Sequence, residues 1–242
     1  MLERSKNTAH RIQWIDQLRG LAICAMVIFH FSFDMMYFGY APQGMVYQLE
    51  WRLFETAIAS SFLFLAGLSF VLAHGNQLIW PKLIRQLWPI LLCAGLISGV
   101  TAVLFGQSMI RFGILHSIAT LMILGVFLRS LPPLWLLALA AGIIAVYVWV
   151  SPPVALPALW GGLIYTENTV FAVDYRPIVP WGAAFVLGMS TASRLRPTPR
   201  LSKPLSAVHK TLSWAGRNSL IIYMLHQPIL FAGFFLFGAI KP

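Results

Sequence analysis

Four ionisable side chains lie in one long apolar stretch near the start of the sequence, where such groups are costly and usually functional. They are Asp16, Arg19, His30 and Asp34, between residues 15 and 38. Eleven residues separate Arg19 from His30, so a helix places both on one face about 16 Å apart. Asp34 follows one turn later, where its carboxylate can orient the imidazole and favour its protonated form. The spacing predicts a histidine base with a carboxylate partner. Two structural alternatives stay open: an interfacial ion pair of Asp16 with Arg19, and a hydrogen-bonded strut at His30.

Other polar residues are expected at the same depth as His30. They precede or begin further apolar stretches: Arg52, Arg111, His116, Asp174 and Arg176. With His30 and Asp34 they would line one cavity, in which the arginines bind an acceptor or a developing oxyanion. Each has an ordinary alternative, because charged helix ends are often solvated and His116 also fits a packed core. In the last apolar stretch His226 lies near mid-membrane, two residues before Pro228, and fits a structural role as well as a catalytic one.

The apolar stretches make up most of the chain. It has 242 residues, 59% hydrophobic and 10% charged, with a mean hydropathy of +0.77, whereas soluble domains carry about 25% charged residues. Seven stretches are candidate membrane spans; they run roughly over 15–38, 54–73, 88–105, 113–130, 134–150, 177–193 and 218–239. We predict an all-α polytopic membrane bundle of about seven transmembrane helices. A cytoplasmic segment, 1–14, precedes a single domain, 15–242.

The distribution of cations predicts the orientation of this bundle. With the N-terminus in the cytoplasm, twelve of the seventeen Lys and Arg residues lie on the inner side and four on the outer side, as the positive-inside rule requires. The C-terminus is then extracytoplasmic, and the net charge of +10 reflects topology, with no nucleic-acid partner. Cys24 and Cys93 lie in apolar stretches, which excludes a disulfide framework or a Cys-rich zinc site. Gly95 and Gly99 form a G-x-x-x-G pattern, which predicts close helix packing.

Several motifs, in their order and spacing, resemble the catalytic region of the heparan-alpha-glucosaminide N-acetyltransferase family of membrane acyltransferases, known among bacteria as a domain of unknown function. The matching stretches are residues 11–23, 29–34, 61–67, 112–116 and 174–177, with Pro180 and Trp181. The arginine followed eleven residues later by histidine is also similar to the signature of the wider acyltransferase-3 group, which acetylates surface glycans.

The resemblance implies an enzyme that takes acetyl from cytoplasmic acetyl-CoA and delivers it to an amino-sugar or sugar-hydroxyl acceptor across the membrane. His30 matches the motif histidine, as base or transient acyl carrier, and Arg19 matches the arginine. Catalytic candidates are then His30, Asp34 and His116; acceptor-binding candidates are Arg52, Arg111, Asp174 and Arg176; donor-binding candidates are Arg19, Arg85, Arg217 and His226. We expect neither metal nor haem, a location in a bacterial inner membrane, and contact with the lipid bilayer. A homo-oligomer is left open.

Two other functions use the same residues. A proton-coupled transporter would need buried charges of this kind, although the sequence has no internal repeat. A membrane cytochrome would ligate haem between histidines of facing helices, for which His30, His116 and His226 are candidates.

Overall fold

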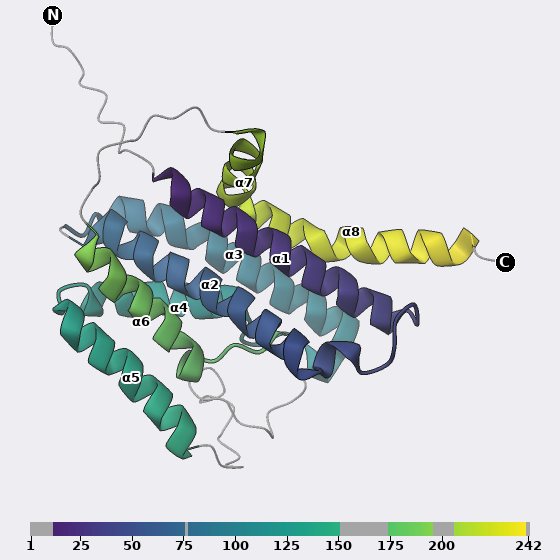
Figure 1. The fold of residues 1–242 in the computed structure, drawn as a ribbon, viewed down its shortest axis with the longest axis horizontal. Coiled ribbons are helices and arrows are strands. Elements are labelled where there is room, and N and C mark those ends of the chain that lie inside the picture. The colour runs from purple at the N-terminus through teal and green to yellow at the C-terminus, as the bar shows by residue number, and fades with distance from the viewer. Residues whose placement is uncertain (1–11, 76, 151–173, 196–205, 241–242) are drawn as a thin grey trace, which may run out of the picture.

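The structure is a computed structural model that describes residues 12–75, 77–150, 174–195 and 206–240. Within these ranges it consists of eight α-helices and two short 3-10 turns, with no strand. The helices are α1 (Gln13–Tyr37), α2 (Leu49–His74), α3 (Trp80–Phe105), α4 (Ile114–Leu128), α5 (Pro133–Val150), α6 (Ile178–Arg194), α7 (Ala207–Arg217) and α8 (Ser219–Ile240) (Figure 1). The predicted all-α class is confirmed.

Each predicted membrane span coincides with one helix, although α3 begins at Trp80 and not at residue 88. Four helices are long and apolar enough to cross a membrane: α1, α2, α3 and the Ser219–Gly238 part of α8. The 15 residues of α4 rise about 22 Å, less than the bilayer core of about 30 Å. The count of seven spans and the orientation of the termini therefore stay predictions. Residues 1–11 and 151–173 lie outside the described residues. So do four more of the cations counted for the orientation: Arg196, Arg200, Lys203 and Lys241.

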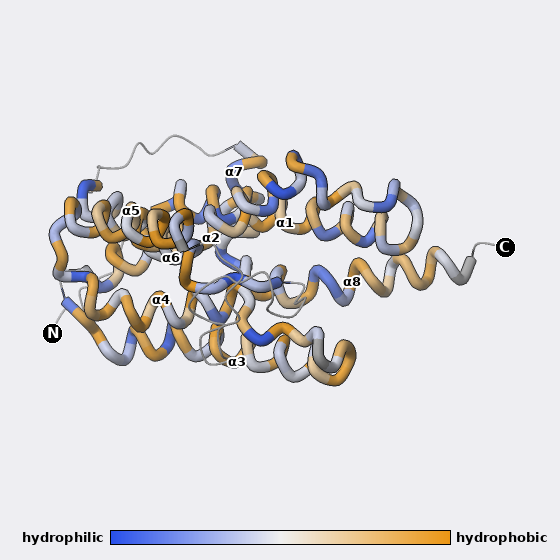
Figure 2. The backbone as a smooth tube through the Cα atoms, turned by 90° about the horizontal axis from the view of Figure 1, so that it is seen from below, coloured by the Kyte–Doolittle hydropathy of each residue, from blue (hydrophilic) through white to orange (hydrophobic). Residues whose placement is uncertain are grey.

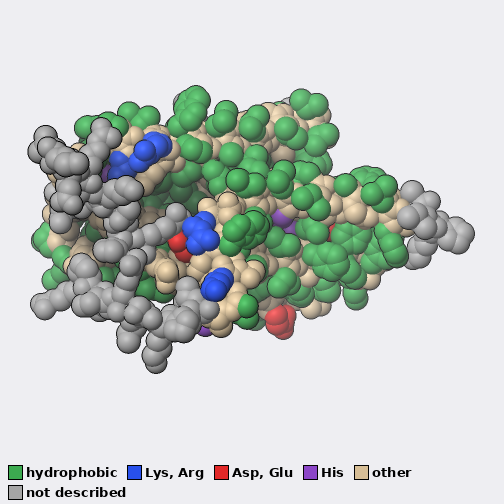
Figure 3. All heavy atoms as spheres, turned by 90° about the horizontal axis from the view of Figure 1, so that it is seen from above, with side chains coloured by type: hydrophobic (Ala, Val, Ile, Leu, Met, Phe, Trp, Pro, Cys, Tyr) green, Lys and Arg blue, Asp and Glu red, His purple; other side chains and the backbone are tan. Residues whose placement is uncertain are grey.

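The outer surface of the bundle is apolar. Hydrophobic residues predominate along the helices (Figure 2), and α3, α5 and α8 turn large hydrophobic side chains outward, including Trp88, Trp149 and Phe235. Figure 3 shows one face covered mostly by hydrophobic side chains, with its visible Lys and Arg groups toward the end where α1 begins. Exposed apolar patches of this extent are rare on soluble monomers. The chain is an integral membrane protein.

The most extensive contact between described helices is the crossing of α2 and α6. Gly67 of α2 lies against the backbone carbonyl of Phe185, and Gly188 of α6 lies against the carbonyl of Phe64. A Cβ atom at either glycine would overlap a carbonyl oxygen of the other helix. Membrane helices associate largely through such close packing, because lipid tails are as apolar as the side chains they replace.

A second crossing of this kind joins α1 to α7. This short helix lies between the predicted spans 177–193 and 218–239, where no helix was predicted. Gly20 of α1 lies against the carbonyl of Leu212, and Gly216 of α7 lies against the carbonyl of Asp16. In Figure 1, α7 runs steeply across α1. The two glycines therefore fix α7 beside the end of α1 at which the chain enters the bundle.

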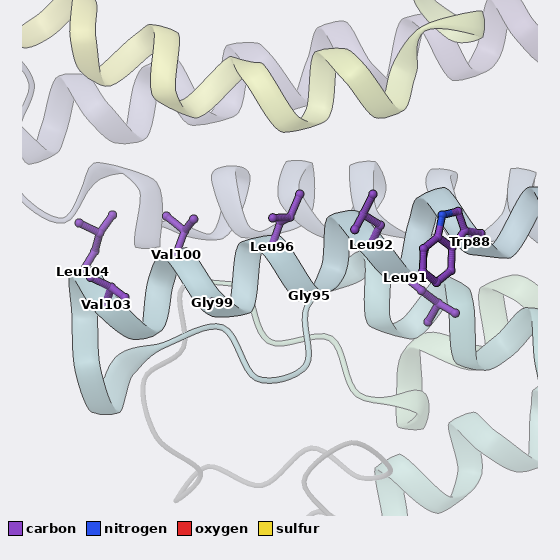
Figure 4. Close-up of a pocket in the computed structure, with 9 residues that line it drawn as sticks. All are labelled: Trp88, Leu91, Leu92, Gly95, Leu96, Gly99, Val100, Val103 and Leu104. Carbon is purple, nitrogen blue, oxygen red and sulfur yellow. The ribbon is translucent and has the colours of Figure 1, made fainter.

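The G-x-x-x-G pattern in α3 does not take part in such a crossing. A Cβ at Gly95 or Gly99 would meet nothing within 4 Å among the described residues. The two glycines instead form the floor of a shallow apolar groove on the surface of α3, bordered by Leu92, Leu96 and Val100 (Figure 4). The prediction of close packing at this pattern is wrong within the described part of the chain.

Candidate active site

The centre of the site is a pair of histidines from opposite ends of the sequence. The rings of His30 on α1 and His226 on α8 have centroids 4.7 Å apart and planes inclined at 61°. Farther along the same two helices, Phe31 and Phe38 contact Phe234 with centroids 5.5 Å and 5.2 Å apart. These aromatic contacts hold α8 along α1. The predicted base thus has a second imidazole as its neighbour.

His226 is held in one orientation by its own helix. Its Nδ1 donates a hydrogen bond of 2.6 Å to the backbone carbonyl of Tyr223. A carbonyl can only accept, so Nδ1 carries the proton and Nε2 presents a lone pair. This Nε2 is buried and has no hydrogen-bond partner among the described residues. Pro228 follows inside the helix and lacks an N–H, so a carbonyl of the previous turn loses its usual donor.

Asp34 is fully buried, but its partner differs from the predicted one. Its Oδ1 accepts a hydrogen bond of 2.8 Å from Nε2 of Gln227 on α8. Its Oδ2, like Oε1 of Gln227, is buried without a partner in the described part of the chain. No described hydrogen bond joins Asp34 to His30, so the expected carboxylate–imidazole contact is replaced by a contact between α1 and α8. The sequence gave no signal for Gln227, because a glutamine next to a proline matches no catalytic motif.

Asp174, just before α6, connects three elements around this pair. Its Oδ2 accepts hydrogen bonds of 3.1 Å from the backbone N–H of Ile114 and from the hydroxyl of Tyr223. The first of these satisfies a free N–H at the start of α4, where a carboxylate is favourable. Its Oδ1 lies 3.6 Å from Nε of Arg176. Tyr223 contacts His226 as well, with ring centroids 5.7 Å apart. A continuous chain of contacts therefore runs from Asp174 to the histidine pair.

Arg176 is the partly buried cation of the site. It pairs with Asp174 and also with Glu55 of α2, and its guanidinium lies 4.8 Å from the ring centroid of Trp181. Its backbone carbonyl accepts from the hydroxyl of Ser117 on α4. Sequence reasoning missed Glu55, although an acidic residue within the predicted span 54–73 was a signal that could have been used. Asp174 and Arg176 meet each other, but these contacts join them to residues that the sequence did not indicate as site residues, and the predicted shared cavity stays a prediction.

His116 lies at the start of α4 with both ring nitrogens engaged. Its Nδ1 accepts a hydrogen bond of 3.2 Å from the N–H of Gly113, so the ring proton is on Nε2. That Nε2 lies 3.2 Å from the hydroxyl of Ser98, which itself donates to the carbonyl of Ile110. His116 thus caps α4 and ties it to α3. This geometry favours the packed structural alternative over a catalytic role.

Four of the other predicted residues are exposed arginines. Arg52 on α2 and Arg111 before α4 carry exposed side chains, as do Arg85 on α3 and Arg217 on α7. Figure 3 shows cations of this kind at the surface. His226, which was grouped with the donor-binding residues, lies beside His30 instead.

Arg19 is integrated into the bundle. It forms an ion pair of 3.3 Å with buried Asp16 and donates a hydrogen bond of 2.9 Å to Ser69 on α2. The ion-pair alternative for Asp16 and Arg19 therefore describes the geometry, and Arg19 also links α1 to α2. His74, at the end of α2, is buried and hydrogen-bonded to Gln86.

The described ranges contain no group of three or more His, Cys, Asp or Glu side chains that could hold a metal ion. The rings of His30 and His226 contact each other directly, which leaves no room between them for a porphyrin. This geometry argues against that pair as axial haem ligands.

Comparison with known families decides the class of this site. The family model described as heparan-alpha-glucosaminide N-acetyltransferase, catalytic, matches residues 11–228. The chain belongs to this family. The match includes both residues of the histidine pair and every residue of the Asp174 network. No curated protein and no solved structure matches the chain. Family membership and the apolar helices together indicate a membrane acetyltransferase.

Proposed function

We propose that this protein transfers acetyl from cytoplasmic acetyl-CoA to an amino-sugar or sugar-hydroxyl acceptor on the extracytoplasmic side, with His30 at the transfer point. One observation carries the proposal: a chain of this acetyltransferase family holds two imidazoles in contact within its bundle, connected to a buried ion-pair network. Polar groups are retained within a membrane mainly where they are used.

The reaction needs three things that the site can supply. An acceptor must lose a proton to a base, the thioester must be held near the acceptor, and the oxyanion that develops on the acetyl group needs hydrogen-bond donors. The imidazole of His30 serves as the base or as a transient acyl carrier. The guanidinium of Arg176 is the donor nearest the pair along the chain of contacts, because the one O–H of Tyr223 already donates to Asp174.

The Asp174 network acts mainly by positioning. Asp174 and Glu55 both pair with the guanidinium of Arg176, so its positive charge is already engaged in ion pairs within the protein. Their contacts join α2, α4, α6 and α8 around the histidine pair. Preorganisation of this kind keeps catalytic groups in place without a cost at the moment of reaction.

On the cytoplasmic side, the phosphates of CoA require cations. The exposed Arg85 and Arg217 are suited to this contact. Arg19, bonded to Asp16 and Ser69, holds α1 against α2 at the end where the donor enters. The donor then enters from the end where α1 begins and directs its acetyl group toward His30, about 16 Å farther along the helix.

The test measures release of the free CoA thiol from acetyl-CoA by purified protein, with and without a panel of amino sugars and glycosides. We expect acceptor-stimulated release by the wild type and none by His30→Ala. The matched control is His209→Ala, which removes an exposed histidine of α7 and should retain activity. A folded His30→Ala protein with full activity would refute the role of His30.

A proton-coupled transporter is the second candidate, favoured by the partly buried Arg176–Glu55 and Arg176–Asp174 pairs, since proton-coupled carriers also use charges within the membrane. The two functions differ in one result. A transporter reconstituted in vesicles moves solute without consuming acetyl-CoA, whereas the proposed enzyme releases one CoA thiol for each acetylated acceptor.

A further inference from the structure

Three hydrogen-bond acceptors where α8 meets α1 lie buried without a partner among the described residues. They are Nε2 of His226, Oε1 of Gln227 and Oδ2 of Asp34. Buried polar atoms in folded proteins nearly always have partners, so an unpaired group calls for an explanation. With Asp34 ionised and His226 neutral, all three of these atoms accept and none donates. A ligand that satisfies them must therefore bring N–H or O–H donors, as an amine or a sugar hydroxyl does.

The contacts around the three atoms fix which way they face. Asp34 Oδ1 and Gln227 Nε2 bond to each other at 2.8 Å, so the carboxylate and the amide direct their second oxygens elsewhere. His226 Nδ1 is held by the carbonyl of Tyr223 at 2.6 Å, which leaves Nε2 as the basic atom. Among the described residues, two ionisable rings contact His226: those of Tyr223 and His30.

Resting on the proposed function, we propose that His226 is the base that takes the proton of the acceptor, and that Gln227 with Asp34 anchors the acceptor beside it. The acceptor nitrogen or oxygen forms a bond to the acetyl carbonyl carbon, and the carbon–sulfur bond of the thioester breaks. The electron pair leaves with sulfur as the CoA thiolate. The acceptor proton passes to Nε2 of His226 and then to the thiolate, so that the products are the acetylated acceptor and CoA.

This assignment separates the two histidines. His226 has a fixed tautomer with its lone pair available, whereas no described hydrogen bond fixes the ring of His30. With His226 as the base of a direct transfer, His30 needs neither of the two roles given to it above; in contact with His226 from α1, it positions the acetyl group instead. General base catalysis contributes about 10²- to 10⁴-fold to a rate, so loss of His226 should cost at least about 100-fold in kcat.

The test uses the purified full chain, acetyl-CoA, and the acceptor that gives the largest release with wild type. His226→Ala should lose about 100-fold or more in kcat while its KM for acetyl-CoA stays within about twofold of wild type. Added imidazole should restore part of the rate. Pyrrole, a ring of the same size without a basic lone pair, should not. His226→Gln, which keeps a polar side chain for folding, should be as slow as His226→Ala.

Gln227→Leu tests the anchoring contact, because leucine has a similar length and no polar atoms. We expect its KM for the acceptor to rise about tenfold with kcat and the KM for acetyl-CoA little changed. An unchanged acceptor KM would overturn the anchoring role.

The outcomes distinguish this inference from the proposed function. An active wild type with a His226→Ala variant of equal kcat, or rescue by pyrrole as strong as by imidazole, would overturn the base assignment and leave the acetyltransferase intact. No release by wild type with any acceptor would overturn both.

Discussion

Replacement of Gly67 by alanine tests whether the close crossing of α2 and α6 stabilises the bundle. The new Cβ would overlap the carbonyl oxygen of Phe185, and an overlap with backbone is relieved only by separating the helices. Leu63, Leu68 and Phe185 around the crossing are completely buried, so separation would also open cavities. Overpacking of a core costs about 1–3 kcal/mol, and this rigid contact places Gly67→Ala near the upper end, at about 3 kcal/mol.

The matched control is Gly95→Ala on α3, where the same added methyl group meets nothing within 4 Å. Alanine is the better helix former by about 1 kcal/mol in water, so this variant should be neutral or slightly stabilised. A change of 1 kcal/mol shifts Tm by about 2–4 °C for a chain of this size. We therefore expect Gly67→Ala to melt about 6–12 °C below Gly95→Ala.

Thermal unfolding of both variants in one detergent, followed by size-exclusion chromatography after heating, measures this difference. Gly188→Ala should behave like Gly67→Ala, since its Cβ would overlap the carbonyl of Phe64. Equal melting temperatures for Gly67→Ala and Gly95→Ala would refute the close crossing, because the two variants change the sequence in the same way and differ only in their neighbours.

Three further predictions concern the polar residues. Glu55→Gln removes one of the two carboxylates that pair with Arg176. Because Glu55 is one-third exposed, the free energy of unfolding should fall by about 1–3 kcal/mol, measured as a lower Tm. An unchanged Tm would argue against the pair. His116→Ala should lower the free energy of unfolding by about 1 kcal/mol, as for a lost helix cap, and should reduce CoA release less than His30→Ala does. An equal loss of CoA release from folded protein would make His116 a catalytic residue. Arg19→Ala should raise the KM for acetyl-CoA more than the KM for the acceptor, and the opposite ratio would remove Arg19 from the donor side.

The helices could be predicted from the sequence because their signal is local. A run of apolar residues forms a helix in a bilayer whatever its neighbours are, since backbone groups must be satisfied within the segment. The same reasoning found the ionisable residues of the first span and the segment around Asp174. Its errors were also local. It placed the start of α3 too late and passed over α7, which is only 11 residues long.

The partners of these residues could not be predicted. From the sequence, Asp34 is closest to His30, one turn away on the same helix; in the structure it bonds to Gln227, 193 residues later. His226 and Glu55 join the site only because α8 and α2 pack beside α1 and α6. Which helices adjoin depends on the complementarity of whole surfaces, which no single segment contains.

The glycines show the same division. The sequence by itself determined that the chain is helical, apolar and embedded in a membrane, and that ionisable groups lie inside it, because each follows from composition and spacing along one segment. Only the tertiary structure decided that Gly67 and Gly188 mark a crossing while Gly95 and Gly99 do not. The value of a small residue depends on whether another backbone lies opposite it, and that is a property of the packed bundle.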